Sequence, residues 1–286
     1  MYYVNLVGGS GNRFFQVLFA AWLKERFNES VVVGCFDDGG KLASCEEVSK
    51  LIEQLRLSRS NDFSFSFSRR GRRLLHRCGI SFEKHPVVSD SDLSNFLEAP
   101  KNEAIYIFDG YWQTSWLIEW WCEVRERLIG GKHGELRESG NLAATVAVVQ
   151  VRRGDYARGF WNRLIFSALS LQYYIEACEF LSQNYAVRSF DVVSDDPEYT
   201  KQFFLPALIS KLGPRGFSFQ HVSATADADL ERIRSTSFFV GANSTFGLFA
   251  WLTSYPKQAL VIFPKRWFRL FRSPLHGLNM SDMLRI

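Results

Sequence analysis

Two adjacent arginines, Arg152 and Arg153, have the type and position that most strongly suggest chemistry in this chain. They directly follow an apolar run that ends at Val151, and Asp155 comes two residues later. A guanidinium stays charged and prefers bidentate oxygen partners, so an arginine at the end of a buried strand indicates an anionic ligand. A diphosphate meets this need, because a preset arginine stabilises the charge that builds on a departing phosphate. A salt bridge between Arg153 and Asp155 is the structural alternative.

A serine and two aspartates follow a second apolar run, as Ser194, Asp195 and Asp196. A carboxylate can accept two parallel hydrogen bonds from the N1–H and the exocyclic amine of guanine. Aspartate before proline is also a common helix start, because its side chain caps the first backbone N–H groups. We therefore assign Asp195 to a guanine base and Asp196 to the cap of a helix that begins at Pro197.

Two further junctions between a strand and a helix could face an anion. Asn243, Ser244 and Thr245 follow an apolar run, and their hydroxyls and free backbone N–H groups can hold phosphate. A glycine-rich turn that includes Gly11 and Asn12 offers backbone N–H groups in the same way. The alternatives are a helix cap in the first case and a tight strand-to-helix connection in the second.

The elements that must position these clusters follow from the hydrophobic pattern. In the second half, apolar strands alternate with helices, which predicts a parallel sheet covered on both faces. The predicted strands are Thr145–Val151, Ser189–Val193, Phe238–Gly241 and Ala259–Phe263, and the predicted helices are Leu171–Asn184, Pro197–Leu205 and Thr245–Leu252. Such sheets bind ligands at the carboxyl ends of their strands, where the arginine, aspartate and serine clusters fall.

The first half shows a sparser pattern. The predicted strands are Tyr2–Val7, Phe63–Phe67 and Ile105–Phe108, and the predicted helices are Phe14–Phe27, Cys45–Leu57 and Leu117–Leu128. A glycine-rich, charged stretch from Gly130 to Gly140 predicts a linker. We therefore expect two domains, at residues 1–140 and 141–286, although one long domain is compatible with 286 residues.

Composition limits the class of protein. Hydrophobic residues make up 47% and charged residues 22%, which is typical of a globular chain and excludes wholesale disorder. A net charge of +4 suits an anionic small ligand better than duplex DNA, so we expect no nucleic-acid partner. The basic run Arg69–Arg73 could meet lipid headgroups or form an ordinary solvated face.

The cysteines and the N-terminal residues predict the compartment. The 5 cysteines include no Cys-x-x-Cys pair, and the 5 histidines show no metal-ligand spacing, so we expect a reducing compartment and no bound metal. The first residues lack the basic region of a signal peptide. We expect a cytoplasmic protein, with peripheral contact to the inner membrane compatible with the basic run.

Together these motifs resemble glycosyltransferase family 11, the α-1,2-fucosyltransferases of the bacterial type. The similar elements, in the family's order, are Gly8–Gln16, Gly110–Thr114, Gln150–Tyr156, Ser194–Asp196 and Asn243–Leu252. This chain departs from the family pattern at three places: Gln150 replaces histidine, Arg13 replaces glutamine, and Gly247 with Leu248 replaces aromatic residues.

The resemblance implies an α/β protein of the GT-B type, with two Rossmann-like lobes, parallel sheets and a cleft between them. The N-terminal lobe would hold a galactose-terminated glycan acceptor, and the C-terminal lobe would hold the donor substrate GDP-fucose without a metal or other cofactor. It further implies transfer of fucose to the 2-hydroxyl of galactose with inversion at the anomeric carbon.

Matched positions give the expected site residues. Arg152 would be catalytic by binding the diphosphate, and Asp155 is our own candidate for the base that takes the acceptor proton. Donor contacts would come from Gly11, Asn12, Arg152, Arg153, Ser194, Asp195, Asn243, Ser244 and Thr245. Acceptor contacts would come from Tyr111, Trp112 and Gln113.

Other functions stay open from the sequence alone. The chain could use another nucleotide-sugar or form another fucosyl linkage, and Gln150 is compatible with a non-catalytic nucleotide- or glycan-binding relative. The Asp227-Ala228-Asp229 segment has the Asp-x-Asp form of metal-dependent transferases, and a helix start is its structural alternative.

Overall fold

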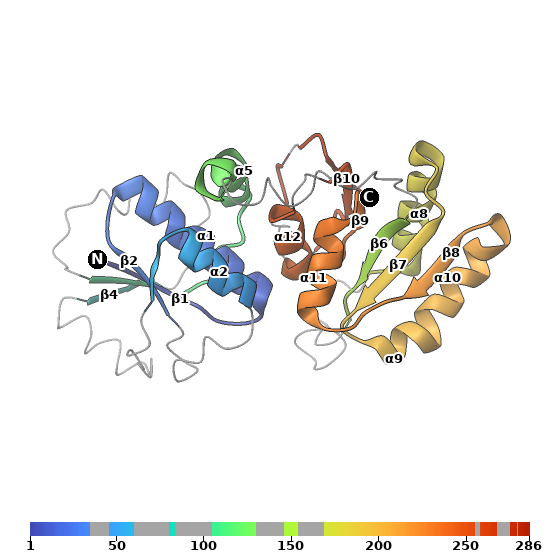
Figure 1. The fold of residues 1–286 in the computed structure, drawn as a ribbon, viewed down its shortest axis with the longest axis horizontal. Coiled ribbons are helices and arrows are strands. Elements are labelled where there is room, and N and C mark those ends of the chain that lie inside the picture. The colour runs from blue at the N-terminus through green and yellow to red at the C-terminus, as the bar shows by residue number, and fades with distance from the viewer. Residues whose placement is uncertain are drawn as a thin grey trace. The chain divides into compact units, whose positions relative to one another are not determined.

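The computed structural model describes residues 1–34, 46–59, 80–83, 105–129, 146–153, 169–254, 258–267, 275–278 and 280–286. The chain forms two compact units, Met1–Lys132 and His133–Ile286, and each has its own sheet (Figure 1). Several predicted features lie outside the described residues: the strand Phe63–Phe67, the basic run Arg69–Arg73, the linker Gly130–Gly140, the domain boundary at residue 140, and Asp155.

The first unit is built on a parallel five-stranded sheet in the order β3-β2-β1-β5-β4. Its strands are β1 (Tyr2–Asn5), β2 (Val31–Gly34), β3 (Ser58–Arg59), β4 (Ile80–Glu83) and β5 (Ile105–Phe108). Its helices are α1 (Ser10–Phe27), α2 (Glu46–Gln54) and α5 (Ser115–Ile129). Helix α1 is buried along most of its length, since its apolar residues surround the axis instead of forming one stripe.

The second unit is built on a parallel six-stranded sheet in the order β11-β10-β9-β6-β7-β8. Its strands are β6 (Val146–Val151), β7 (Ser189–Ser194), β8 (Ser218–His221), β9 (Phe238–Val240), β10 (Leu260–Phe263) and β11 (Met283–Arg285). This is the doubly wound order of nucleotide-binding folds, in which the chain reverses direction across the sheet between the first and fourth strands. Here that switch point lies between β6 and β9.

Helices cover both faces of this sheet (Figure 1). They are α8 (Leu171–Tyr185), α9 (Pro197–Tyr199), α10 (Leu205–Leu212), α11 (Ala226–Ser235) and α12 (Thr245–Leu252). A π-helical turn, Thr200–Phe204, joins α9 to α10, and a 3₁₀ turn, Gly213–Arg215, follows α10. The predicted helix from Pro197 therefore continues seven residues beyond its expected end at Leu205, and Pro206 comes directly after the π-helical turn, at the beginning of α10.

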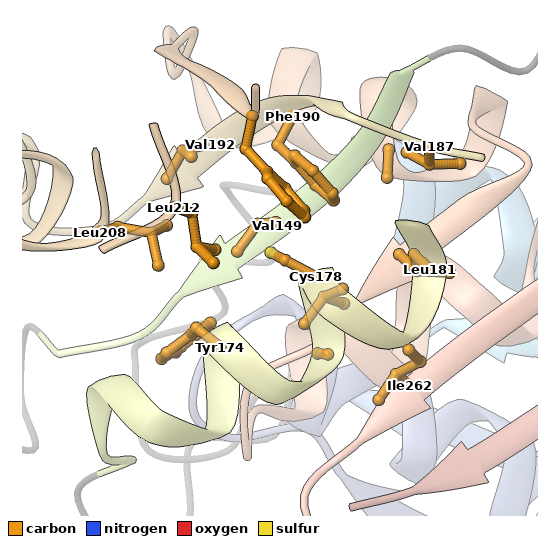
Figure 2. Close-up of a cluster of buried hydrophobic side chains, with 14 of the residues drawn as sticks. Val149, Tyr174, Cys178, Leu181, Val187, Phe190, Val192, Leu208, Leu212 and Ile262 are labelled. Atoms are coloured by element: carbon orange, nitrogen blue, oxygen red, sulfur yellow. The ribbon is translucent and has the colours of Figure 1, made fainter. Parts of the chain in front are cut away.

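The core of the second unit forms where α8 and α10 pack on β6 and β7 (Figure 2). Val149, Phe190 and Val192 contribute the sheet side, and Cys178 and Leu208 contribute the helix side; all of them are buried. Burial raises the pKa of the Cys178 thiol above its usual range, so this cysteine stays protonated and serves as an apolar side chain.

Two adjacent tyrosines of α8 fasten this helix to the strand ends at the switch point. The Tyr173 hydroxyl donates to the carbonyl of Gly241 at 2.6 Å, and the Tyr174 hydroxyl lies 3.2 Å from the carbonyl oxygen of Gln150. Both rings are buried, and desolvation raises the pKa of both phenols, so each remains a hydrogen-bond donor. Two neighbouring strands are thereby held to one helix at the edge where ligands bind.

The predicted fold class is confirmed, because both units are parallel α/β sheets. Strands β2, β3, β4, β8 and β11 were not predicted. The residues of β8 and β11 show little apolar alternation and are largely half-exposed or exposed, whereas the three valines of β2 offered a signal. Within the described part of the chain, no helix has the length and apolar character needed to cross a membrane.

Candidate functional site

Three of the predicted clusters meet at one edge of the second unit's sheet. Strands β9, β6 and β7 are neighbours in that sheet, and Val151 at the end of β6 is paired with Ser194 at the end of β7. Arg152, Asp195 and Ser244 follow the carboxyl ends of β6, β7 and β9 respectively. This edge includes the switch point, where the diverging loops of a doubly wound sheet leave room for a ligand.

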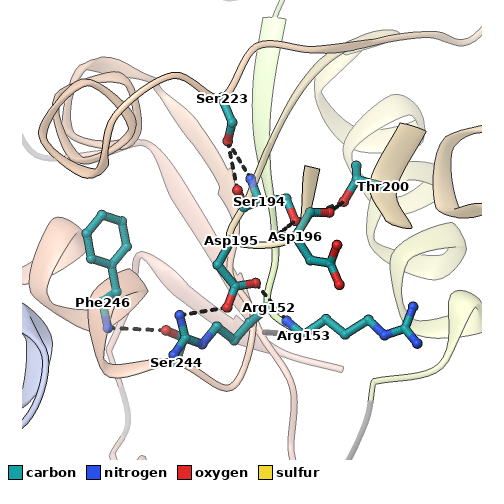
Figure 3. A network of polar contacts seen from close by, with 9 residues as sticks. All are labelled: Arg152, Arg153, Ser194, Asp195, Asp196, Thr200, Ser223, Ser244 and Phe246. Carbon is teal, nitrogen blue, oxygen red and sulfur yellow. Dashed lines mark hydrogen bonds and ion pairs between the residues drawn. The ribbon is translucent and has the colours of Figure 1, made fainter. Parts of the chain in front are cut away.

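Asp195 joins the ends of β6 and β7 (Figure 3). One carboxylate oxygen lies 2.8 Å from Nη1 of Arg152, and the other accepts a hydrogen bond from the backbone N–H of Arg153 at 2.9 Å. The Arg152 side chain is 29% exposed and the Asp195 side chain 24%, so a ligand from solvent can reach both groups. A carboxylate has about four lone-pair sites, so Asp195 keeps capacity to accept further hydrogen bonds.

The two adjacent arginines point in different directions (Figure 3). The guanidinium of Arg153 lies over the ring of Tyr199, 3.6 Å from its centroid, and Tyr199 in turn stacks on Phe203. A contact of this kind is worth roughly 0.5–2 kcal/mol, depending on how far it is desolvated. Tyr199 was not predicted from the sequence, although a tyrosine one turn after Asp195 offered a signal. The alternative pair of Arg153 with Asp155 involves a residue outside the described ranges.

The prediction that Asp196 caps the next helix is confirmed. Its side chain accepts from the backbone N–H of Tyr199 at 3.1 Å, and Pro197 occupies the first helical turn. The hydroxyl of Ser194 accepts from the N–H of Asp196 at 3.0 Å and from the buried hydroxyl of Thr200 at 2.8 Å. These bonds fix the turn that presents Asp195.

A second serine, Ser223, supports the same turn from the β8 side (Figure 3). Its hydroxyl accepts from the N–H of Ser194 at 2.6 Å and lies 2.7 Å from Oδ2 of Asp229, to which it donates. Ser223 was not predicted, because a serine in a short loop has no distinguishing sequence pattern. The Asp229 carboxylate is thus used inside the protein, beside the start of α11.

The Asp-x-Asp segment is explained by that helix start. Thr225 caps α11 by accepting from the N–H of Ala228. Asp227 and Asp229 lie in the first turn of this helix, where a negative charge interacts favourably with the helix dipole. Among the residues that the structure describes, no group of three or more carboxylate, histidine or cysteine side chains is arranged to hold a metal ion.

Ser244 is the N-cap of α12, since its hydroxyl accepts from the N–H of Phe246 at 3.3 Å. The cap expected as an alternative is therefore present, and a contact of Ser244 with phosphate stays a prediction. The neighbouring Asn243 donates to the carbonyl of Trp267 at 3.0 Å and is buried, while Thr245 is half-buried. Asn243 thus anchors the loop to the segment that follows β10.

The first unit brings its two motifs together in a similar way. The side chain of Gln113 donates to that of Asn12 at 2.9 Å, which links the segment after β5 to the glycine turn after β1. Gln16, fully buried, accepts from the N–H of Val7 and donates to the carbonyl of Gly110, both at 2.9 Å. Strands β1 and β5 are neighbours in this sheet, and each of the two motifs follows one of them.

The three predicted acceptor residues have different environments. Tyr111 is 53% exposed and Gln113 is half-buried, so both can reach a ligand. Trp112 is only 1% exposed, and its ring stacks on Phe19 with centroids 3.8 Å apart. Its predicted acceptor contact therefore needs correction: in this structure Trp112 supports the first unit's core from inside, and its positive φ of 53° turns the chain there.

Comparison with known proteins identifies the family. A model described as Glycosyl transferase family 11 matches residues 83–267, which is more than half of the chain. The chain belongs to glycosyl transferase family 11. An alpha-1,2-colitosyltransferase of Escherichia coli is 26% identical to this family 11 member over 171 residues, which cover 56% of each protein. The chain thus matches about half the length of that curated relative.

Solved structures resemble this family 11 chain only distantly. POFUT1 in complex with GDP has a TM-score of 0.45 at 13% identity, covering 92% of this chain and 97% of that one. The fucosyltransferase NodZ from Bradyrhizobium has a TM-score of 0.43 at 10% identity, covering 87% and 91%. Likenesses at this level assign neither function nor site residues.

His221, at the end of β8, lies near the Ser223 and Asp229 network. Its pKa is lowered, chiefly by desolvation and next by the positive charge of Lys201, while the carboxylate of Asp229 acts in the opposite direction. The folded state therefore favours the neutral imidazole. As the pH falls through the ordinary histidine pKa of about 6.5, the unfolded chain becomes protonated at His221, whereas the folded protein does so only at a lower pH.

We expect this histidine to make the protein less stable as the pH falls. The contribution of His221 is fully present above about pH 6.5 and declines as the pH drops toward the lowered folded pKa. Urea unfolding at pH 7.5 and pH 5.5 should show a smaller loss of stability in His221→Gln than in the unchanged protein. Equal losses in both proteins would show that His221 is not the cause.

Proposed function

We propose that this family 11 member is an α-1,2-fucosyltransferase that transfers L-fucose from GDP-β-L-fucose to the 2-hydroxyl of a terminal galactose, with inversion and without a metal ion. The observation that carries the proposal is the Arg152–Asp195 pair at the switch point of a doubly wound sheet. It combines an arginine suited to diphosphate with a carboxylate suited to guanine, and family membership supports sugar transfer.

The free energies of the two kinds of contact favour a change of partner, in which Arg152 leaves Asp195 and binds the diphosphate of the donor. A partly exposed ion pair contributes roughly 0–1 kcal/mol, because solvent screens it. Hydrogen bonds to charged groups contribute about 1.5–3 kcal/mol each, and arginine can form two in parallel with a phosphate. A diphosphate can therefore recruit the guanidinium of Arg152 at low cost, which leaves Asp195 able to accept from the guanine N1–H and amine.

The reaction would be a single displacement. The acceptor oxygen forms a bond to the anomeric carbon on the face opposite GDP, while the bond from that carbon to the phosphate oxygen breaks and GDP keeps the electron pair. Arg152 would stabilise the charge that develops on the leaving diphosphate. The acceptor proton passes to a base, for which Asp155 remains our candidate. General-base help is typically worth about 10²–10⁴-fold.

The acceptor side is assigned to the first unit. Tyr111 and Gln113 follow β5, and the bond from Gln113 to Asn12 joins this segment to the turn after the neighbouring strand β1. An exposed tyrosine ring suits the apolar face of a sugar, and an amide suits its hydroxyls. A galactose-terminated glycan fits this chemistry. The predicted contact with an inner membrane surface, and a cytoplasmic location, are part of the same proposal.

A second candidate function is colitosyl transfer with the same α-1,2 linkage. The similarity to an alpha-1,2-colitosyltransferase favours it, and the Arg152–Asp195 arrangement would serve a different sugar on the same nucleotide equally well. A nucleotide-binding relative without turnover is the third possibility, which the departure at Gln150 keeps open.

A donor and acceptor panel tests the proposed reaction. The purified protein should convert GDP-fucose and a galactoside into a product with a new fucosyl linkage at the 2-hydroxyl, in buffer that contains EDTA. Product mass and linkage analysis provide the measurement. Turnover only with a colitosyl donor would favour the second candidate, and GDP binding with no turnover on any acceptor would contradict an enzymatic function.

Replacing Arg152 tests its role as the diphosphate group. In Arg152→Ala, transfer should fall by about 10²–10³-fold while the fold is retained, because the charge on the leaving group is no longer countered and loss of one such electrostatic group typically has that cost. The matched control is Arg232→Ala, since Arg232 pairs with Asp191 at 2.7 Å in the same unit. Near-normal turnover in Arg152→Ala, or an equal loss in the control, would contradict the role.

Removing the Asp195 carboxylate distinguishes two roles of this residue, recognition of the guanine ring and orientation of Arg152. If Asp195 accepts from the guanine amine, the unchanged protein should bind GDP about 10-fold or more tightly than IDP, which lacks that amine. In Asp195→Ala this ratio should approach one. If Asp195 only orients Arg152, both nucleotides should weaken by the same factor and the ratio should not change. Calorimetric titration measures both affinities.

A further inference from the structure

The side-chain amide of Gln150 is buried near the carboxyl end of β6, the strand that leads to Arg152. Gln150 precedes Arg152 by two residues and is 5% exposed. Its side-chain oxygen accepts from the backbone N–H of Ala242 at 3.3 Å. Because Val149 and Val151 pack in the cluster formed with α8 and α10, the alternation of the strand turns Gln150 to the opposite face, toward α12.

Gly247 in α12 has no side chain, and this leaves room for the amide of Gln150. A Cβ atom on Gly247 would lie 2.4 Å from the side-chain oxygen of Gln150 and 3.3 Å from the ring of Phe239. The amide is the movable end of a long side chain, so a methyl group at position 247 would displace it without a clash against backbone. The two departures from the family pattern, at Gln150 and at Gly247, thus fit one another in space.

Hydrogen bonds from several elements hold the loop between β9 and α12. The N–H of Gly241 donates to the carbonyl of Ile262 in β10, and the carbonyl of Gly241 accepts from the Tyr173 hydroxyl. The Asn243 side chain donates to the carbonyl of Trp267. The bond from the N–H of Ala242 to Gln150 joins the loop to β6, the strand that leads to Arg152.

We propose that Gln150 is a positioning residue of the donor site. It holds the loop from Ala242 to Thr245 in a fixed position relative to Arg152. This inference rests on the proposed function, in which the N-terminal end of α12 and the Arg152 guanidinium face the same diphosphate. An N–H group that has lost its acceptor must find another by moving, and the loop would then shift relative to Arg152. The amide therefore acts through the loop and not on the substrate.

Substitution by methionine removes the acceptor at nearly constant volume. GDP should bind Gln150→Met about 3- to 10-fold more weakly than the unchanged protein, which corresponds to the loss of one hydrogen bond. The control is Gln258→Met: Gln258 is also a buried glutamine of this unit, 3% exposed, and it donates to the carbonyl of Ile233. A merely structural role would lower thermal stability in both variants and leave GDP affinity unchanged in both, which would overturn the proposal.

A substitution at the neighbouring glycine distinguishes the hydrogen bond from space filling. Gly247→Ala should displace the amide and weaken GDP binding by the same 3- to 10-fold factor. In the double variant Gln150→Ala with Gly247→Ala, loss of the Gln150 amide relieves the clash with the new methyl group but restores no acceptor, so affinity should stay as low as in the single variants. Recovery of full affinity in the double variant would show that the acceptor at position 150 is not needed, and would refute the proposal.

Hydrogen exchange separates failure of this inference from failure of the proposed function. Amide exchange in the segment 242–245 should be faster in Gln150→Met than in the unchanged protein, and unchanged in Gln258→Met. This measurement needs no ligand. If the unchanged protein binds no GDP, the proposed function fails while the exchange result still decides whether Gln150 holds the loop. Unchanged exchange in Gln150→Met would overturn the inference by itself.

Discussion

The contact between Arg152 and Asp195 is the interaction on which the chemistry proposed for the second unit depends. A guanidinium at the end of a buried strand must meet an anion, and in this structure Asp195 supplies it at 2.8 Å. The same carboxylate accepts from the N–H of Arg153, so it also ties β6 to β7. Since both side chains remain partly exposed, another anion can compete with Asp195 for the Arg152 guanidinium.

The surrounding polar network holds the backbone segments on either side of this pair. Ser194, Thr200 and Ser223 fix the turn that carries Asp195, while Gln150 and Tyr173 fix the loop that carries Ser244. Each of these groups is hydrogen-bonded to backbone or to another side chain of the network, so little rearrangement of the site is needed when a ligand binds. Preorganisation of this kind allows a charged group to act on a developing negative charge in the transition state.

The sequence predicted the parts of the protein that have a strong local pattern. Apolar strands such as the one ending at Val151 and helices such as Leu171–Asn184 lie within a residue or two of their predicted limits, because burial imposes their composition. The cap at Asp196 followed from its position before proline. Residues whose role depends on a distant partner were missed: Tyr199, Ser223 and the buried state of Trp112 are set by tertiary contacts.

A structure of the protein with GDP bound would test the central claim most directly. The account predicts that the Arg152 guanidinium lies within about 2.7–3.0 Å of a phosphate oxygen, and that Asp195 accepts from the guanine. GDP bound with its phosphates away from Arg152, and with the Arg152–Asp195 contact unchanged, would contradict it.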